Sequence, residues 1–219
     1  MKESGLSAIA AKYQLPRLPG KVVRISRRQP FFLIVGLEHR GIGAPPAIWW
    51  LQDYFNRLGR PYYLALQSAA GSFGSNSQAL QVTQVMTDRP CRTIKAGRGQ
   101  VRFFVKRDIE RTPTQQLAQA PAPLFISTPE ATVFDLIRYA TSIGGIERAA
   151  ETIAPLLPML RVRELKRVLD AENKPAIAQR LGFVIEAGGA KKLVNAFHDW
   201  LPDKLVPVVL GADQIYKTD

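Results

Sequence analysis

One stretch near the middle of the chain, residues 124–139 (LFISTPEATVFDLIRY), constrains the fold more than any other. It predicts a short apolar strand, a sharp turn and then an amphipathic helix. Ser127 and Glu130 have the spacing of a capping box, in which each side chain satisfies a free backbone N–H at the start of a helix. Alternatively, Thr128 caps the helix and Pro129 takes the first helical position, where its missing N–H costs nothing. Both registers start a helix at nearly the same residue.

The helix that follows this turn carries apolar side chains at helical spacing. Val133, Phe134 and Ile137 fall on one face and predict contact with a core. Asp135 and Arg138 lie three residues apart, so we expect them to form an ion pair along the helix. This element is explained by structure alone, and we expect Asp135→Ala to harm folding before function.

Composition restricts the class of protein. The chain has 219 residues, of which 46% are hydrophobic, and its formal net charge is +12. Such a chain can bury a core, and its positive charge favours a polyanionic partner, with nucleic acid as the leading candidate. Cys91 is the only cysteine, which excludes an intramolecular disulfide. No apolar run approaches membrane-spanning length and the N-terminus lacks the apolar segment of a signal peptide, so we expect a cytoplasmic protein without membrane contact.

The first part of the chain, residues 1–44, is the most basic block. Residues 21–25 (KVVRI) and 31–35 (FFLIV) predict two strands of a hairpin whose tip, SRRQP, is basic. The hairpin is either a solvated surface element or the wing of a winged-helix domain. In the second case its arginines would contact DNA phosphates, and the candidate DNA-binding residues are Arg24, Arg27, Arg28 and Arg40.

A turn-rich segment, residues 41–46 (GIGAPP), predicts a domain boundary near residue 44. We therefore divide the chain into an N-terminal part (1–44), which contains the hairpin (21–35) and would be a partial winged helix if that hairpin is a wing, and a larger domain (45–219). The pattern predicts helices at 47–58, 61–73, 146–154, 162–170, 175–187 and 191–200. It predicts strands at 80–86, 101–105 and 124–126, and an edge strand at 205–210. The expected class is α+β, with a mixed α/β domain that ends in a helical part.

A second basic cluster lies between the predicted strands of the larger domain. Its members fall at strand ends and turns, where they could form one continuous cationic face. A solvated rim is the alternative. The candidate residues of this face are Arg89, Arg92, Lys95, Arg98, Lys106, Arg107 and Arg111.

The candidate catalytic and metal-binding motifs in the sequence are incomplete. His39 and His198 have no partners at metal-ligand spacing, and Gly74-Ser75 resembles a nucleotidyltransferase motif but precedes a strand without paired carboxylates. We therefore expect no enzyme, no metal and no cofactor. Two alternatives stay open. One is a metal-dependent enzyme acting on nucleic acid, with carboxylates Asp88, Asp108 and Glu110, and the other is a protein-interaction module without affinity for nucleic acid.

Four segments resemble one known family. They are residues 61–74 (PYYLALQSAAGSFG), 87–90 (TDRP), 97–114 (GRGQVRFFVKRDIERTPT) and 127–139 (STPEATVFDLIRY). Together they resemble the AbiEi antitoxins, predicted transcriptional regulators of bacterial phage-defence operons. The resemblance spans roughly residues 20–200, and the STPEAT-x-x-DL-x-RY block is its most specific part.

The resemblance implies both a function and a partner. Family members pair a small N-terminal winged helix with a larger antitoxin domain and oppose a nucleotidyltransferase toxin. In this type IV arrangement no stable complex with the toxin is expected. The winged helix would repress its own operon by binding DNA, and RNA is a second candidate partner of the basic face. About twenty residues precede the hairpin, so the recognition helix is expected to be mostly missing and sequence preference to be weak.

Overall fold

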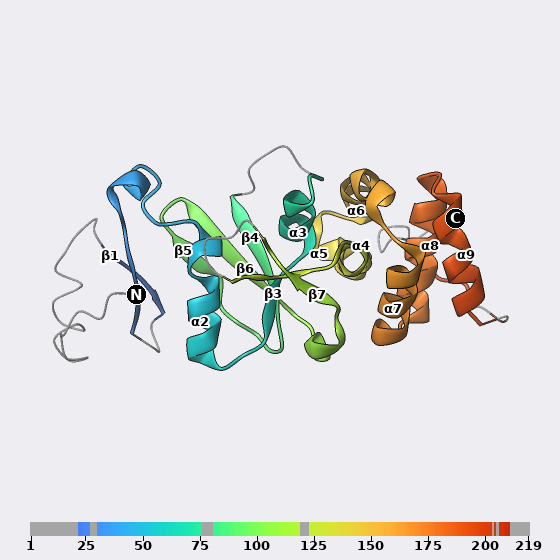
Figure 1. Cartoon of the computed structure of the whole chain (residues 1–219), viewed down its shortest axis with the longest axis horizontal. Coiled ribbons are helices and arrows are strands. Elements are labelled where there is room, and N and C mark those ends of the chain that lie inside the picture. Colours follow the sequence, from blue (N-terminus) through green and yellow to red (C-terminus); the bar gives the residue numbers. More distant parts are fainter. Residues whose placement is uncertain are drawn as a thin grey trace, which may run out of the picture.

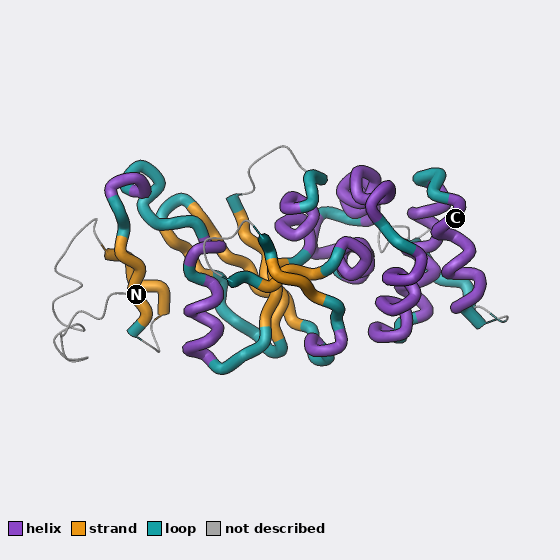
Figure 2. The backbone as a smooth tube through the Cα atoms, in the orientation of Figure 1, coloured by secondary structure: helices purple, strands orange, loops and turns teal. Residues whose placement is uncertain are grey.

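A computed structural model describes residues 22–26, 30–75, 81–118, 123–202, 204 and 206–210. The molecule is elongated along one axis (Figure 1). A two-stranded hairpin lies at one end, a six-stranded sheet in the middle and a group of helices at the other end. Figure 2 shows the same division, with strands in one half and most helices in the other. The class is α+β, as predicted.

The hairpin forms as the sequence predicts. Strands β1 (Val22–Ser26) and β2 (Phe31–Ile34) pair antiparallel. A hairpin alone is marginally stable in water, and this one packs against helix α2 (Leu51–Leu58). The ring of Phe31 meets the ring of Tyr54 edge-on at 5.5 Å, and Arg57 Nη1 donates to the carbonyl oxygen of Pro30 at 3.0 Å. The hairpin therefore belongs to the same core as α2.

The central sheet has the strand order β5-β6-β4-β3-β8-β7. β4 runs parallel to β6 and β3 runs parallel to β8, whereas the other neighbours are antiparallel. Two short strands, β5 and β7, were not predicted. The strands are β3 (Tyr62–Leu64), β4 (Val82–Thr87), β5 (Ile94–Ala96), β6 (Gly99–Val105), β7 (Thr114–Gln116) and β8 (Phe125–Ser127).

The helix predicted over residues 61–73 is wrong in its first half. The structure divides this segment into strand β3 and helix α3 (Leu66–Ser72). All three residues of β3 are buried because β3 lies in the middle of the sheet, between β4 and β8. A short apolar run with buried neighbours on both sides cannot be distinguished from a helix by periodicity. Leu66, with φ of 53°, makes the turn between the two elements.

Most of the remaining helices agree with the sequence pattern. The bounds of α8 and α9 are those predicted, but the strand predicted at 205–210 is wrong because residues 206–210 form no strand. Pro207 cannot donate to a ladder, which disfavours pairing there. The other elements are η2 (Leu37–His39), η3 (Ala47–Trp49), η4 (Ile109–Arg111), α4 (Pro129–Arg138), α5 (Ala140–Ile143), α6 (Ile146–Ile153), η5 (Ala154–Met159), α7 (Val162–Glu172), α8 (Pro175–Ala187) and α9 (Lys191–Trp200).

Helix α4 begins in the second of the two predicted registers. Thr128 is the cap, its Oγ1 accepts a hydrogen bond from the backbone N–H of Ala131 at 3.3 Å, and Pro129 is the first helical residue. The capping box does not form because Glu130 Oε1 instead accepts from the backbone N–H of Arg161 at 2.9 Å. Glu130 therefore joins the start of α4 to the start of α7.

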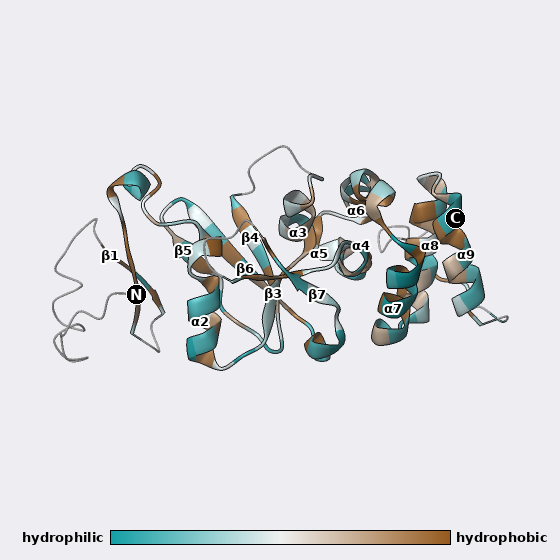
Figure 3. Ribbon diagram, viewed as in Figure 1, coloured by the Kyte–Doolittle hydropathy of each residue, from teal (hydrophilic) through white to brown (hydrophobic). Residues whose placement is uncertain are grey.

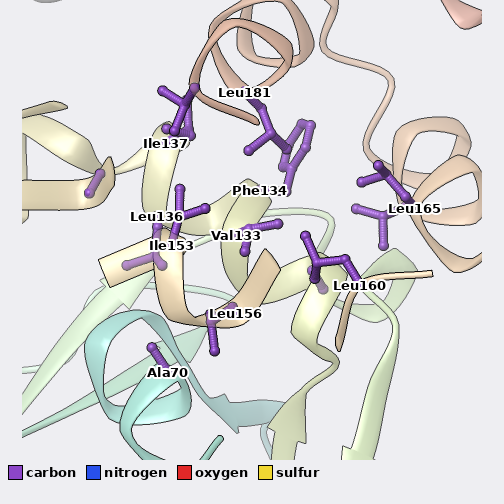
Figure 4. Close-up of a cluster of buried hydrophobic side chains, with 14 of the residues drawn as sticks. Ala70, Val133, Phe134, Leu136, Ile137, Ile153, Leu156, Leu160, Leu165 and Leu181 are labelled. Atoms are coloured by element: carbon purple, nitrogen blue, oxygen red, sulfur yellow. The ribbon is translucent and has the colours of Figure 1, made fainter. Parts of the chain in front are cut away.

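Helix α4 is the centre of the larger core. Its residues from Glu130 to Ile137 are all buried, and the helices of the C-terminal half pack around it. Figure 4 shows Phe134 of α4 among Leu160, Leu165 and Leu181, which come from three later segments. Figure 3 shows hydrophilic residues along much of α2 and α7, on the outside of the molecule. A helix buried on nearly every side places its polar residues where they must find partners.

Candidate nucleic-acid interface

Strand direction divides the predicted basic face between two ends of the sheet. Arg89 follows β4 and Arg107 follows β6, and since these strands are parallel both residues lie at the same end. Arg92 precedes β5, which runs antiparallel to β6, so it also lies toward that end. Lys95 and Arg98 lie toward the opposite end, where β6 begins. These five side chains are exposed, and the strand directions place them toward two different ends of the sheet.

The end of the sheet that carries Lys95 and Arg98 brings together residues of the predicted DNA-binding set and residues of the predicted basic face. The backbone N–H of Arg98 donates to the carbonyl oxygen of Ile42 at 2.8 Å, so the loop that carries Arg40 lies against the β5–β6 turn. Gly97 makes this approach possible, because a Cβ there would overlap the Ile42 carbonyl oxygen. Exposed Arg40 thus joins the end that carries Lys95 and Arg98.

Strand β1 places Arg24 near the end of the sheet that carries Lys95 and Arg98, since β1 packs beside β5. Arg24 is exposed, its Nε donates to the carbonyl oxygen of Ser26 at 2.8 Å, and its guanidinium group lies 5.8 Å from the centre of the Phe32 ring. The two other predicted DNA-binding residues, Arg27 and Arg28, lie outside the described residues.

The prediction that Lys106 belongs to an exposed basic face is wrong. Lys106 is 1% exposed and its Nζ donates to Asp135 Oδ1 of α4 at 2.8 Å and to Glu172 Oε1 of α7. Both carboxylates are buried as well. A buried amino group of this kind needs partners of opposite charge, and here two elements from the helical half supply carboxylates. Lys106 therefore joins the sheet to the helices.

Two further side chains complete this buried charge network. Tyr63 donates its hydroxyl proton to Asp135 Oδ2 at 2.7 Å, and burial together with the Asp135 carboxylate raises the pKa of Tyr63 well above 10. Arg138 Nη1 contacts Glu172 Oε2 at 3.1 Å. The predicted Asp135–Arg138 pair is therefore replaced by two pairs to other elements. Two cations and two carboxylates balance, so the network is neutral as a whole.

Glu172 also holds a loop that carries two arginines. Its Oε1 accepts hydrogen bonds from Lys106 Nζ and, at 2.9 Å, from Thr112 Oγ1. Lys106 and Thr112 are the residues on either side of loop 107–111, which presents exposed Arg107 and Arg111. We call this arrangement the Glu172 clamp, because one oxygen atom ties both ends of the loop to the last turn of α7.

A hollow lies beside the clamped loop. It has a volume of about 490 Å³ and is lined by Arg111 of η4 and by Arg167, Asp170 and Ala171 of α7. Arg167 Nη1 pairs with Glu164 Oε2 at 2.8 Å, one turn earlier in the same helix. Asp170 Oδ1 accepts from the indole N–H of Trp200 at 2.8 Å. The hollow thus combines two guanidinium groups with one carboxylate.

The carboxylates of the alternative metal site do not assemble. Asp88 Oδ1 is 2.7 Å from the guanidinium group of Arg60, and Asp88 Oδ2 is 3.0 Å from Arg89 Nε. Burial acts to raise the pKa of Asp88, but the hydrogen bonds from these arginines outweigh it and lower that pKa below its ordinary value of 3.8. Within the described ranges, no three or more His, Cys, Asp or Glu side chains are grouped closely enough to hold a metal ion.

Several residues of this region were not singled out from the sequence. Glu172, Thr112 and Arg167 come from segments that look like ordinary helix or loop. Only the tertiary fold brings Glu172 to Lys106 and Thr112, and Arg167 to the hollow beside Arg111. One signal for Lys106 was present. Side chains alternate along a strand, so Lys106 continues the inward face of Phe104 just beyond the end of β6, while Arg107 points outward.

Among the described residues, none of the helices is long and apolar enough to cross a membrane. No curated protein matches the chain. A solved structure, the crystal structure of the RV2827C protein from Mycobacterium tuberculosis, is similar with a TM-score of 0.65 and 17% sequence identity. The similarity covers 93% of this chain and 73% of that chain. At this identity the comparison shows a shared fold.

The sequence comparison with protein families is more specific. The AbiEi antitoxin C-terminal domain matches residues 63–187, which is more than half of the chain. The matched segment begins at Tyr63 and contains every member of the buried charge network, the clamped loop and the hollow. The family resemblance predicted from the sequence is confirmed, and the chain belongs to the AbiEi antitoxin family.

Proposed function

We propose that this protein is the antitoxin of a type IV toxin–antitoxin system and opposes a nucleotidyltransferase toxin. The match of residues 63–187 to the AbiEi antitoxin domain carries this proposal. The net charge of +12 supports an action on nucleic acid. An antitoxin of this type acts without a stable complex, and it would meet the nucleic acid that the toxin modifies.

The end of the sheet that carries Arg89, Arg92, Arg107 and Arg111 is the surface we assign to this action. Arg107 and Arg111 form no ion pair with any carboxylate of the described residues, so their charges are available to phosphates. Arginine suits this role because its planar guanidinium group binds phosphate through two parallel hydrogen bonds. The clamp holds the short loop that carries both arginines against α7.

Growth of cells that express the toxin tests this assignment. Co-expression of the neighbouring nucleotidyltransferase with the wild-type chain should restore growth. The double variant Arg107→Glu/Arg111→Glu should restore it at least about tenfold less well, because reversed charges repel phosphate. A matched control is Arg148→Glu/Lys192→Glu, which makes the same change in net charge at exposed positions of α6 and α9. Failure of the wild type to restore growth rejects the antitoxin role, and equal rescue by both double variants rejects the surface.

We further propose that the chain binds DNA at its own promoter, as a regulator. The hairpin end of the molecule supports this, since Arg24 and Arg40 are exposed there together with Lys95 and Arg98. Phosphate contacts contribute most of the affinity of such a surface, and their strength falls steeply with salt. The proposed contacts include Arg27 and Arg28, which follow β1 in the sequence and lie outside the described residues.

An electrophoretic shift tests the regulatory role. The promoter fragment should bind more tightly than a scrambled duplex of equal length. The variant Arg40→Gln/Arg98→Gln should weaken binding to both duplexes by a similar factor and reduce the dependence of affinity on salt, because phosphate contacts carry no sequence information. Equal affinity of the wild-type chain for the two duplexes would reject specific repression and leave the antitoxin proposal untouched.

A further inference from the structure

The hollow beside the clamped loop has the chemistry of a nucleotide subsite. It is open to solvent and is lined by two guanidinium groups and one carboxylate. We propose that it holds one nucleotide of an RNA chain, with the phosphate on Arg111 and Arg167 and the ribose 2′-hydroxyl donating to Asp170. This inference rests on the proposed action on nucleic acid and names the class of nucleic acid that the antitoxin surface prefers.

The two arginines supply the phosphate site. Arg111 forms no ion pair with a carboxylate anywhere in the described ranges. Arg167 pairs with Glu164, but that side chain of Arg167 is 65% exposed and the pair lies along one helix. Exposed pairs of this kind contribute little free energy, so a phosphate can replace Glu164 at low cost. Two guanidinium groups from separate elements then contact one phosphate from two sides.

Asp170 is the feature that favours RNA. Its Oδ1 accepts from Trp200, and its Oδ2 has no hydrogen-bond partner within the part of the chain that the structure describes. A carboxylate in a purely phosphate-binding site would repel its ligand. Beside a phosphate site it can instead accept a hydrogen bond from a hydroxyl group, and the 2′-hydroxyl is the group that distinguishes RNA from DNA.

The Glu172 clamp determines where Arg111 lies. Thr112 follows Arg111 directly, and its hydroxyl donates to the carboxylate of Glu172. Glu172 lies on α7, the helix that also carries Arg167 and Asp170. Of the two bonds of the clamp, the one from Thr112 lies next to Arg111 and ties the loop wall of the hollow to its helix wall. We therefore regard Thr112 as a positioning residue that acts through Arg111.

Fluorescence anisotropy with the full chain tests the proposal. The probes are a labelled single-stranded oligoribonucleotide and the oligodeoxyribonucleotide of the same sequence, at physiological salt. The wild type should bind the RNA several times more tightly than the DNA. Arg111→Gln and Arg167→Gln should each weaken RNA binding about tenfold, and Asp170→Ala should reduce the RNA affinity to that for DNA. The control Arg148→Gln removes an exposed arginine that is also paired along its helix, with Glu151, and should change neither affinity.

A conservative pair tests the positioning role. Thr112→Val keeps the shape of the buried side chain but removes its donor, and it should lower the preference for RNA while Thr112→Ser preserves it. Three outcomes overturn the proposal: equal binding of RNA and DNA by the wild type, a loss with Arg148→Gln as large as with Arg111→Gln, or tighter RNA binding with Asp170→Ala. The growth assay is scored separately. RNA preference in a wild-type chain that fails to restore growth would support the subsite and reject the antitoxin role.

Discussion

Replacement of Lys106 by methionine should lower the free energy of unfolding by about 3–5 kcal/mol. Methionine matches the length of the lysine stem but leaves Asp135 and Glu172 buried without their shared cation. Two carboxylates near each other in a dry interior must then take up protons or open the structure to water. The effect is large because the network joins β6, α4 and α7, so its failure affects the contact between the sheet and the helices.

Urea unfolding monitored by circular dichroism measures this loss. Arg148→Met is the matched control, since Arg148 forms an exposed pair with Glu151 and its removal should cost less than about 1 kcal/mol. Similar unfolding free energies for Lys106→Met and the control would contradict the buried position of Lys106. They would restore the exposed basic face that the sequence suggested.

Replacement of Gly97 by alanine should lower the free energy of unfolding by about 2–3 kcal/mol. Gly97 has φ of +57°, which L side chains rarely adopt, and a Cβ there would overlap the carbonyl oxygen of Ile42. The hydrogen bond from the backbone N–H of Arg98 to that oxygen, 2.8 Å long, would break. The loop that carries Arg40 should therefore separate from the β5–β6 turn.

Hydrogen exchange and thermal unfolding measure this effect together. The amide of Arg98 should lose protection in Gly97→Ala, and the melting temperature should fall. Gly41→Ala is the control in the facing loop, which carries Arg40, because Gly41 has no atom within 4 Å of an added Cβ. If Gly97→Ala and Gly41→Ala have the same melting temperature, the close approach of the loop to the sheet does not stabilise the protein. A loss of DNA affinity in Gly97→Ala alone would connect this approach to the proposed regulatory surface.

Local signals in the sequence were sufficient for the elements with clear ends. The hairpin, α4, α8 and α9 have caps, prolines or turn residues at their ends, and each lies where the pattern placed it. The choice between two caps at the start of α4 could not be made locally. It depends on Glu130, whose carboxylate is used by the backbone of Arg161, thirty-one residues later in the chain.

Three strands without an amphipathic pattern could not be predicted from the sequence. Strand β3 is buried on every residue because it lies between two other strands, and its apolar run gave no periodicity to interpret. Strands β5 and β7 have three residues each, and each pairs with a single neighbour at an edge of the sheet. Neither has an apolar run like the one that made β8, a strand of the same length, predictable.

The sequence by itself determined the family, the α+β class and the strongly basic character of this protein, because motifs, caps and net charge are local or additive properties. The tertiary structure alone decided what each charge does. It placed Lys106 in the interior, divided the exposed basic residues between two ends of the sheet and brought Arg40 to Arg98. Whether a charged side chain is buried and paired depends on carboxylates from distant elements, and strand order and helix packing bring those elements together.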